Sequence, residues 1–319
     1  MKIAIADNNA RKFIGDLIDH WTLKGHDIKM QYPNHEVKYE PGASEKLAQW
    51  ADIYYIDTWD NNIHYLYKLY HGDQGVSRTP DWDNNKKPTI VVRALDWEVW
   101  IGLARDQLII DWVDKIIVIA PHIEKELRKH GDFGDKIKLI RPGVNLDKFT
   151  LKTKPTDGFQ LGMVLGDMWK YKNHMGGLDI FTTLYQKDNR WRLHIRGQHE
   201  NSTYDPINFE HYLESRGIKN VVTLYPHVAD VNEWLENIDI LLHPGQKEAF
   251  CYAVGEAAAK DIPCIVNDFY GSRDIWPEEI LYRTHEEAIG MITDKNKHYI
   301  FKPRDVKKMM EEYDQYLGL

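Results

Sequence analysis

Two glutamates in the last third of the chain have the most informative spacing. Seven residues separate Glu248 from Glu256, and Glu248 follows a short apolar run at 238–242 that predicts a buried strand. A Pro-Gly pair interrupts this run, and the alanine-rich segment 251–259 favours a helix. We therefore expect Glu248 just before the first helical turn and Glu256 about two turns further on.

The start of this helix also predicts an anion site. The amides of Phe250, Cys251 and Tyr252 open the helix, where backbone N–H groups have no acceptor within the helix itself. A carboxylate beside an anion site suits a ligand that carries phosphate on one side and hydroxyl groups on the other. A sugar nucleotide is such a ligand.

Length, charge and composition limit the class of protein. The chain has 319 residues, of which 43% are hydrophobic and 28% charged, and this suits two soluble domains better than one. The net charge of −8 argues against a general polyanion binder. Acidic residues are interleaved with the basic ones between 124 and 138, as is typical of a solvated face.

Apolar runs and cysteines in the sequence bear on the cellular compartment of the protein. No apolar run approaches the roughly 18 residues that span a bilayer, so we expect no stable membrane insertion. Residues 1–7 read as a first strand, since no long apolar region or cleavage site follows them. The two cysteines, Cys251 and Cys264, form no disulfide framework, and we expect a cytoplasmic protein.

Short β-rich runs alternate with helical patterns, which predicts an α/β protein with doubly wound parallel sheets. The expected strands are 2–6, 27–31, 52–56, 89–94, 115–119 and 137–140, then 159–166, 191–196, 221–224, 238–242, 264–266 and 280–282.

A polar segment with proline and glycine at 151–158 marks the expected domain boundary. We expect a first domain at 1–150, a second at 151–303, and a helix at 304–319 that packs back on the first domain. Ligands of such sheets bind at the carboxyl ends of the strands, so a cleft between the two domains is the expected site.

Five sequence blocks in a fixed order resemble one known family. They are Arg141 to Asn145, Val164 to Gly166 with the following Lys172 and Asn173, Ile195 to Gly197, Leu224 to His227, and His243 to Pro263 with both glutamates. In order and spacing they resemble the retaining GT-B glycosyltransferases, nearest the glycogen synthase-like, sucrose synthase-like and mannosyltransferase group. The resemblance implies two Rossmann-like domains with a cleft between them.

The resemblance also implies a role for each matched residue. Glu248 would contact the donor sugar near the reacting carbon, and Glu256 would accept hydrogen bonds from the ribose hydroxyls. Lys172 would neutralise the leaving diphosphate, and Glu248 and Lys172 are therefore the expected catalytic residues. The other residues expected on the donor side are Gly15, Lys170, Asn173, Arg196, His227, Phe250, Cys251 and Tyr252.

One departure from the family pattern removes a positive charge. Relatives carry a basic residue five positions before the lysine, where this chain has Asp167, and a carboxylate there would repel a diphosphate. We expect either that Asp167 turns away from the diphosphate or that Lys170, Arg196 or Arg273 supplies the missing charge. Our leading hypothesis is that Lys170 acts together with Lys172.

A second departure concerns the histidine that many relatives carry near Leu95. Arg93 and Asp96 are the polar residues nearby, and they are candidates for the sugar or acceptor side. Asp81 and Asp83 match the D-x-D pattern of a different, metal-dependent class of glycosyltransferase. They lie in an expected loop instead of at a strand end, so we expect no metal and no other cofactor.

The favoured function is transfer of a sugar from a nucleotide-diphosphate donor to a hydroxyl acceptor, with retention of anomeric configuration. The departing phosphate oxygen can itself take the acceptor proton. The acceptor stays open among a glycan, a protein, a small molecule and a modified DNA base, and a lipid is not favoured. Two alternatives also stay open: a non-catalytic nucleotide-sugar-binding module, and a nucleotide-sugar epimerase or hydrolase on the same scaffold.

Overall fold

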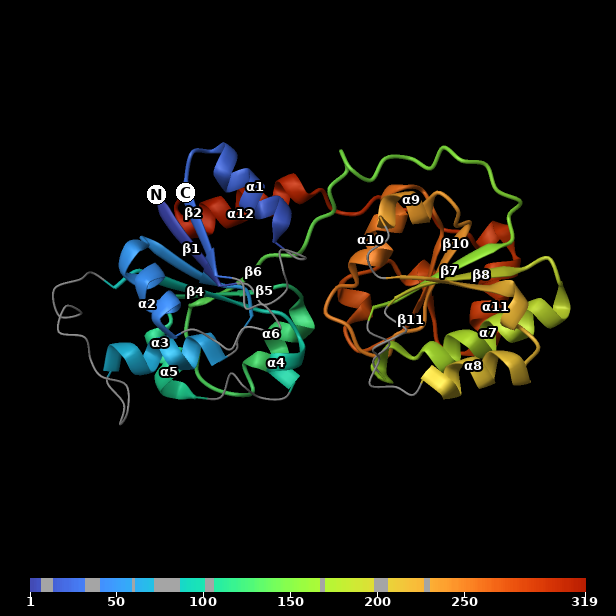
Figure 1. The fold of residues 1–319 in the computed structure, drawn as a ribbon, viewed down its shortest axis with the longest axis horizontal. Helices are drawn as coiled ribbons and strands as arrows, with labels where there is room; N and C mark the ends of the chain where they lie inside the picture. Colours follow the sequence, from blue (N-terminus) through green and yellow to red (C-terminus); the bar gives the residue numbers. More distant parts are fainter. Residues whose placement is uncertain are drawn as a thin grey trace. The chain divides into compact units, whose positions relative to one another are not determined.

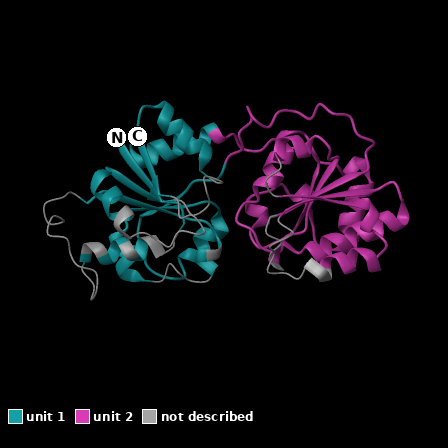
Figure 2. Ribbon diagram, in the orientation of Figure 1, with its two compact units in different colours: residues 1–142, 307–319 teal, residues 143–306 magenta. Residues whose placement is uncertain are grey.

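The computed structural model describes residues 1–6, 14–31, 41–58, 61–71, 87–100, 106–166, 170–197, 206–226 and 230–319. Within them the chain forms two compact units, residues 1–142 with 307–319 and residues 143–306 (Figure 2). Each unit is built around a six-stranded sheet with helices packed beside it (Figure 1). All neighbouring strands pair in parallel, which confirms the expected fold class.

The sheet of unit 1 has the strand order β2-β1-β3-β4-β5-β6. Its strands are β1 Lys2–Ala6, β2 Asp27–Gln31, β3 Ile53–Ile56, β4 Thr89–Ala94, β5 Lys115–Val118 and β6 Ile137–Leu139. Its helices are α1 Gly15–Leu23, α2 Pro41–Trp50, α3 Asn61–His71, α4 Trp97–Trp100, α5 Gln107–Trp112, α6 Pro121–Leu127 and α12 Val306–Leu317. The central strand β3 is buried at every position, as expected of a parallel strand with helices on both faces.

The last helix of the chain, α12, packs within unit 1 (Figure 1). Tyr313 is 1% exposed, and its ring contacts those of Trp21 and Tyr55 at centroid distances of 6.3 Å each. Asp314 accepts a hydrogen bond of 3.0 Å from Trp21 Nε1. The chain leaves unit 1 after Pro142, so the expected domain limits at residues 150 and 303 both fall inside unit 2.

The sheet of unit 2 has the strand order β12-β11-β10-β7-β8-β9. Its strands are β7 Gln160–Gly166, β8 Arg192–Gly197, β9 Val222–Tyr225, β10 Ile240–His243, β11 Cys264–Asn267 and β12 Leu281–Tyr282. Its α-helices are α7 His174–Lys187, α8 Pro206–Ser215, α9 Val231–Leu235, α10 Tyr252–Ala259 and α11 His285–Thr293. Its 3-10 helices are η2 Lys170–Lys172, η3 Lys219–Val221, η4 Ser272–Asp274, η5 Glu278–Ile280 and η6 Lys295–Lys297.

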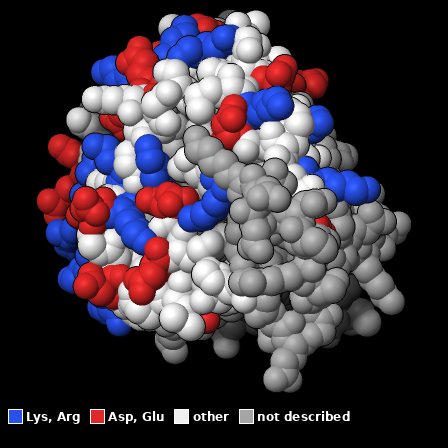
Figure 3. Space-filling model, turned by 90° about the vertical axis from the view of Figure 1, so that its left-hand side faces the viewer, with Lys and Arg blue, Asp and Glu red and all other residues white. Residues whose placement is uncertain are grey.

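The surface charges agree with the sequence pattern. On the described part of the face in Figure 3, basic and acidic side chains alternate, and neither sign gathers into a broad patch. Across the described ranges, no helix has both the length and the apolar character needed to cross a membrane.

Candidate functional site

Two neighbouring strands at the centre of the second sheet define where a ligand can bind. From β7 the chain continues to β8 and β9 on one side, whereas β10 leads to β11 and β12 on the other. The place between two such strands, where the chain turns to opposite sides of the sheet, is called a switch point. Ligands of doubly wound sheets bind there, beyond the carboxyl ends of the strands. Lys172 follows β7 and Glu248 follows β10, so both residues stand at this point.

Lys172 and Glu248 form an ion pair in which Nζ donates to Oε1. The lysine side chain is 21% exposed and the glutamate side chain 8% exposed. Burial by itself lowers the pKa of Lys172, but the Glu248 carboxylate outweighs burial and holds that pKa above its usual value. The structure therefore brings the two expected catalytic residues into contact, with the ammonium group charged.

Hydrogen bonds join the loop after β7 to the loop after β10. Gln246 N donates to Tyr171 O at 2.8 Å, and Asn173 Nδ2 donates to Pro244 O at 3.1 Å. Asn173 has a left-handed backbone (φ 52°) directly before α7. A Cβ at Gly176 would lie 2.6 Å from Asn173 Nδ2, so a glycine one turn later leaves room for the asparagine side chain. These contacts fix the loops that carry the ion pair.

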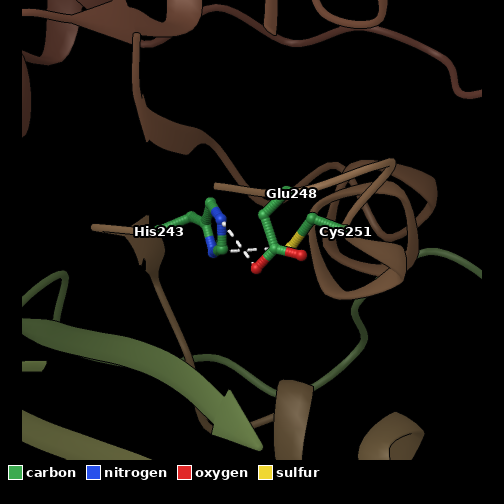
Figure 4. A group of neighbouring side chains, drawn as sticks. All are labelled: His243, Glu248 and Cys251. Carbon is green, nitrogen blue, oxygen red and sulfur yellow. Dashed lines mark hydrogen bonds and ion pairs between the residues drawn. The ribbon is translucent and has the colours of Figure 1, made fainter. Parts of the chain in front are cut away.

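Behind the ion pair lies His243, the last residue of β10, which is 3% exposed. Its Nε2 is 3.5 Å from Glu248 Oε1, and its Nδ1 is 3.4 Å from Cys251 Sγ (Figure 4). Burial, reinforced by the Lys172 charge, lowers the pKa of His243 to about 3. Burial and the Glu248 charge raise the pKa of Cys251 to about 12. The imidazole is therefore neutral and the thiol protonated at neutral pH.

Sequence reasoning gave His243 no role, although the residue was part of a matched block. A histidine in an otherwise apolar strand, directly before a Pro-Gly pair, is the signal that could have identified it. Glycine is needed at position 245 because the backbone there lies against the His243 ring, and a Cβ would be 2.7 Å from His243 Nε2. Asn267 Nδ2 holds the carbonyl of Gly245 at 3.1 Å.

The helix after this loop begins at Tyr252, preceded by Cys251 with a left-handed backbone (φ 64°). The ring of Phe250 packs against Tyr252 and Trp276, at centroid distances of 5.1 and 5.0 Å, and this residue is 8% exposed. Phe250 is therefore a core side chain, and only its backbone remains a candidate ligand contact.

Arg196 and Glu256 are close enough to influence each other electrostatically. Arg196 lies near the end of β8 and is 9% exposed, and Glu256 is half-buried on α10. Burial lowers the pKa of the Arg196 guanidinium, whereas the charges of Glu256 and Asp230 oppose that shift. The expected ribose-binding carboxylate thus has a cation beside it.

Three other candidate residues lie in unit 1. Gly15 is the first residue of α1 and is half-buried. Arg93 is 1% exposed and forms an ion pair of 2.6 Å with Asp57, so its guanidinium lies in the core of unit 1. Asp96 is half-buried between β4 and α4.

Sequence reasoning also missed Glu98, close to the position where relatives carry a histidine. Its carboxylate is 0% exposed and accepts hydrogen bonds from Leu95 N at 2.5 Å and Asp96 N at 3.2 Å. Burial raises its pKa to about 7, although the backbone hydrogen bonds oppose that shift. Glu98 is thus a buried acid that titrates near neutral pH.

Several expected site residues cannot be placed by their side chains. Lys170 begins η2, but its side chain lies outside the described part of the chain. His227, Asp167 and the Asp81–Asp83 pattern also lie outside the described residues. Arg273, offered as a source of positive charge, pairs with Asp268 at 2.8 Å and with Glu278 at 3.2 Å.

A cavity of about 390 Å³ lies elsewhere in unit 2, between α7 and α11. Its lining is largely polar and includes Asp179, Lys187 and Glu286, and no candidate site residue contributes to it. The switch point of the sheet, where Lys172 and Glu248 meet, therefore stays the candidate site.

Comparisons with known proteins agree with this geometry. Residues 152–317 match the family described as Glycosyl transferases group 1. The fold is similar to that of HepE from Anabaena in complex with UDP-glucose, with a TM-score of 0.78 and 14% identity, over 100% of this chain and 99% of that chain. It is also similar to sucrose-phosphate synthase from Thermosynechococcus elongatus, with a TM-score of 0.70 and 15% identity, over 99% of this chain and 94% of that chain.

One curated relative is Protein CapJ from Staphylococcus aureus, which is 22% identical over 196 residues. The match covers 60% of this chain but only 44% of that protein, so the chain spans less than half the length of this relative. At these identities the solved structures show the fold, and the family match concerns the part of the chain that carries Lys172, Glu248 and Glu256.

Proposed function

The chain belongs to the Glycosyl transferases group 1 family and has the GT-B fold, and we propose that it is a retaining transferase. It moves a sugar from a nucleotide-diphosphate donor to a hydroxyl acceptor. The observation that carries this proposal is the contact between Lys172 and Glu248 at the switch point of the second sheet. A cation and a carboxylate at one point suit a ligand with a diphosphate and a sugar.

Lys172 stabilises the leaving group in this proposal. Negative charge grows on the diphosphate oxygen as the bond to the sugar breaks, and a fixed ammonium group aimed at that charge lowers the barrier. The amides at the start of α10, next to Glu248, add partial positive charge. Asn173 contributes by holding the loop after β10 in place.

Glu248 contacts the donor sugar near its reacting carbon, on the other side of the diphosphate from the nucleoside. The departing phosphate oxygen takes the proton of the acceptor hydroxyl, which bonds to the same face of the sugar. No separate strong base is then required. This accounts for a site whose histidine, His243, is neutral and buried behind the carboxylate.

Glu256 accepts hydrogen bonds from the two ribose hydroxyls of the donor. A carboxylate that accepts two hydroxyl donors gives a strong, directional contact. Arg196, whose charge Glu256 helps to maintain against burial, adds positive charge on the nucleotide side. We keep Lys170 as the partner of Lys172, and the change Lys170→Ala tests this assignment through donor affinity and turnover.

The donor that we propose to test first is UDP-glucose. HepE, the structural neighbour from Anabaena, was crystallised with UDP-glucose and with UDP and glucose. We propose that catalysis needs no metal ion. The acceptor is a hydroxyl on a glycan, a protein, a small molecule or a modified DNA base. The free thiols of Cys251 and Cys264 fit a reducing compartment such as the cytoplasm.

The deciding experiment has two stages. Thermal unfolding is first measured with a panel of nucleotides and nucleotide sugars, because a specific ligand raises the melting temperature by mass action. Nucleotide release is then followed with the selected donor and a panel of hydroxyl acceptors, and NMR identifies the anomer of the product. We expect an acceptor-dependent release and a retained anomer.

Other outcomes identify the rival functions. Selective binding with no turnover on any acceptor would favour a non-catalytic binding module. A changed nucleotide sugar, or free sugar without acceptor, would favour an epimerase or a hydrolase. A chain that binds no nucleotide sugar at all would contradict the proposal.

A further inference from the structure

Three side chains with metal-binding atoms converge at the start of α10. One ligand atom each from His243, Glu248 and Cys251 lies within 4.8 Å of the others (Figure 4). They are an imidazole, a carboxylate and a thiol, which together form a donor set typical of zinc. Among the described residues, no other group of three His, Cys, Asp or Glu side chains brings its ligand atoms this close together.

The distance between the histidine and the cysteine is close to that between two ligands of one tetrahedral ion. With a zinc–sulfur bond of about 2.3 Å and a zinc–nitrogen bond of about 2.0 Å, two ligands of one zinc ion stand roughly 3.5 Å apart. Cys251 Sγ is 3.4 Å from His243 Nδ1. Glu248 Oε1 lies 3.5 Å from the other ring nitrogen, Nε2, so the carboxylate must swing toward the Nδ1 side to complete the site.

The backbone decides which imidazole nitrogen is available. The chain at Gly245 lies against the Nε2 side of the His243 ring, where an added Cβ would be 2.7 Å away. Nε2 is buried, makes no hydrogen bond among the described residues, and lies 3.5 Å from Glu248 Oε1. Nδ1 faces the thiol instead. We therefore take Nδ1 as the ligating atom, on the same side of the ring as Cys251.

The three ligands come from one short segment whose backbone is held at several points. His243 is hydrogen-bonded within the sheet, and Asn173 and Asn267 hold the carbonyls of Pro244 and Gly245. Preformed ligands on a fixed backbone lower the entropic cost of binding. A metal ion here would therefore meet a histidine and a cysteine that are already in place.

Lys172 is the competitor of a metal ion at this site. Its ammonium group is hydrogen-bonded to the Glu248 carboxylate, and a metal ion bound to the same carboxylate would repel it. Because 21% of the Lys172 side chain is exposed, it can turn toward solvent when a metal ion takes its place. Binding of a metal would thus separate the two residues that the proposed transfer needs in contact with the donor.

We propose that His243, Glu248 and Cys251 bind a zinc-class divalent ion, and that this ion displaces Lys172 and excludes the donor. Binding forms a bond from each of the three ligand atoms to the metal. The Cys251 S–H bond breaks, its electron pair stays on sulfur, and the proton goes to solvent, so no oxidant or reductant takes part. The site is inhibitory and serves no catalytic step.

Cobalt(II) is the probe for the site, since a cobalt–thiolate bond gives an intense charge-transfer absorption band. We expect the band to saturate at one cobalt ion per chain and to disappear when an equal amount of zinc is added. Cys251→Ser should abolish the band and weaken zinc binding by at least about 100-fold, at the upper end of losses from altered metal surroundings. Cys264→Ala is the matched control, because Cys264 is 1% exposed and its thiol donates to the backbone carbonyls of Val254 and Ile262.

A second variant tests the competition and does not depend on how Cys251→Ser folds. Lys172→Met removes the competing cation, so we expect zinc affinity to rise by about tenfold, as for the loss of one charge contact. A merely structural lysine would not produce this gain. The proposal is overturned if the cobalt band is absent, if it persists in Cys251→Ser, or if Lys172→Met weakens zinc binding.

The inhibitory part rests on the proposed function and is measured separately. We expect saturating zinc to weaken UDP binding by at least about tenfold in the unaltered chain. The ratio of UDP affinities with and without zinc should be near one in Cys251→Ser, which controls for zinc bound to the nucleotide itself. Unchanged UDP affinity in zinc-loaded chain would overturn the inhibition. If UDP fails to bind in metal-free chain, the proposed function fails, whereas the cobalt band still decides the metal site.

Discussion

Lys172 Nζ donates a hydrogen bond to Glu248 Oε1 across 76 positions of sequence. Each residue neutralises the other before any donor is bound. A diphosphate that enters the site offers Lys172 a doubly charged partner, and the sugar offers Glu248 hydroxyl donors. In the proposed function, donor binding would therefore exchange one ion pair for contacts to two different parts of the ligand.

The first prediction concerns this lysine. Lys172→Met should weaken UDP binding by about tenfold to hundredfold, because one hydrogen bond to a charged group is worth about 1.5–3 kcal/mol. Isothermal titration calorimetry with UDP measures the effect. Lys187→Met, at an exposed position at the end of α7, is the control and should bind UDP normally. Equal affinities in both variants would remove Lys172 from the donor site.

The second prediction separates ribose recognition from phosphate recognition. The unaltered chain should prefer UDP over 2′-deoxy-UDP, and Glu256→Ala should lose most of that preference, worth about 1.5–3 kcal/mol. Competition binding of the two nucleotides gives the ratio directly. Glu279→Ala, an exposed glutamate of the same unit, should keep the preference. A preference that survives Glu256→Ala would place the ribose elsewhere.

The third prediction uses the buried acid Glu98, whose pKa is raised from 4.5 to about 7 by burial. The folded chain binds the proton more tightly than the unfolded chain does, so this group stabilises the fold fully below about pH 4.5. That contribution falls as the pH rises to about 7, by up to about 3 kcal/mol. Urea unfolding at several pH values measures it.

A variant isolates the Glu98 contribution from those of other carboxylates. Glu98→Gln keeps the shape of the side chain but cannot titrate, so the free energy of unfolding should vary less between pH 4.5 and 7. Glu311→Gln, at an exposed site on α12, is the control and should keep the original profile. Identical profiles in Glu98→Gln and the unaltered chain would show that Glu98 is ionised throughout.

The fourth prediction concerns how the segment after Phe149 is fastened to unit 2. Lys260 is 2% exposed and pairs with Glu236 at 2.5 Å, while the second oxygen of Glu236 accepts from Thr153 N and Lys154 N at 2.9 Å each. Lys260→Met leaves a carboxylate without its cation and should cost about 3 kcal/mol in thermal unfolding.

Acid should weaken the same attachment. Burial alone would raise the pKa of Glu236, but the Lys260 and backbone hydrogen bonds outweigh it and lower the pKa to about 2. This stabilisation is present above about pH 4.5 and is lost as the pH falls toward 2.

Lys297→Met is the control for Lys260→Met, because it also removes a positive charge but at an exposed position, and it should leave unfolding unchanged. An equal effect of both changes would argue against the attachment.

The fifth prediction tests the last helix. Asp314 accepts from Trp21 Nε1 at 3.0 Å and contacts His20 Nε2 at 2.7 Å. Asp314→Ala leaves a buried indole N–H without its acceptor and should lower the free energy of unfolding by about 2 kcal/mol. Glu311→Ala, on the exposed side of the same helix, should change it by less than about 0.5 kcal/mol. Chemical denaturation of both variants decides whether this contact matters.

Strand positions could be predicted from the sequence with few errors. The run at 89–94 matches β4, and the run at 238–242 matches β10 with a shift of one or two residues at each end. These runs are rich in valine, isoleucine and leucine and are bounded by polar or turn-forming residues. Both signals are local, and local signals determine where a buried strand begins and ends.

The contacts within the site were not predictable in the same way. The sequence indicated Lys172 and Glu248 separately, but nothing in it showed that the two side chains bind each other. Arg93 was a candidate for the sugar or acceptor side, whereas the structure buries its guanidinium against Asp57. Such pairings depend on which strands are neighbours, and the order of the strands is not written in any single segment.

The amino-acid sequence by itself determined the alternation of strands and helices and the family. Only the tertiary structure placed β7 beside β10 and brought His243 behind Glu248. The physical reason is the sequence distance over which each kind of interaction acts. Propensity and periodicity act over a few residues, whereas side chains 76 positions apart meet only after the whole sheet has packed.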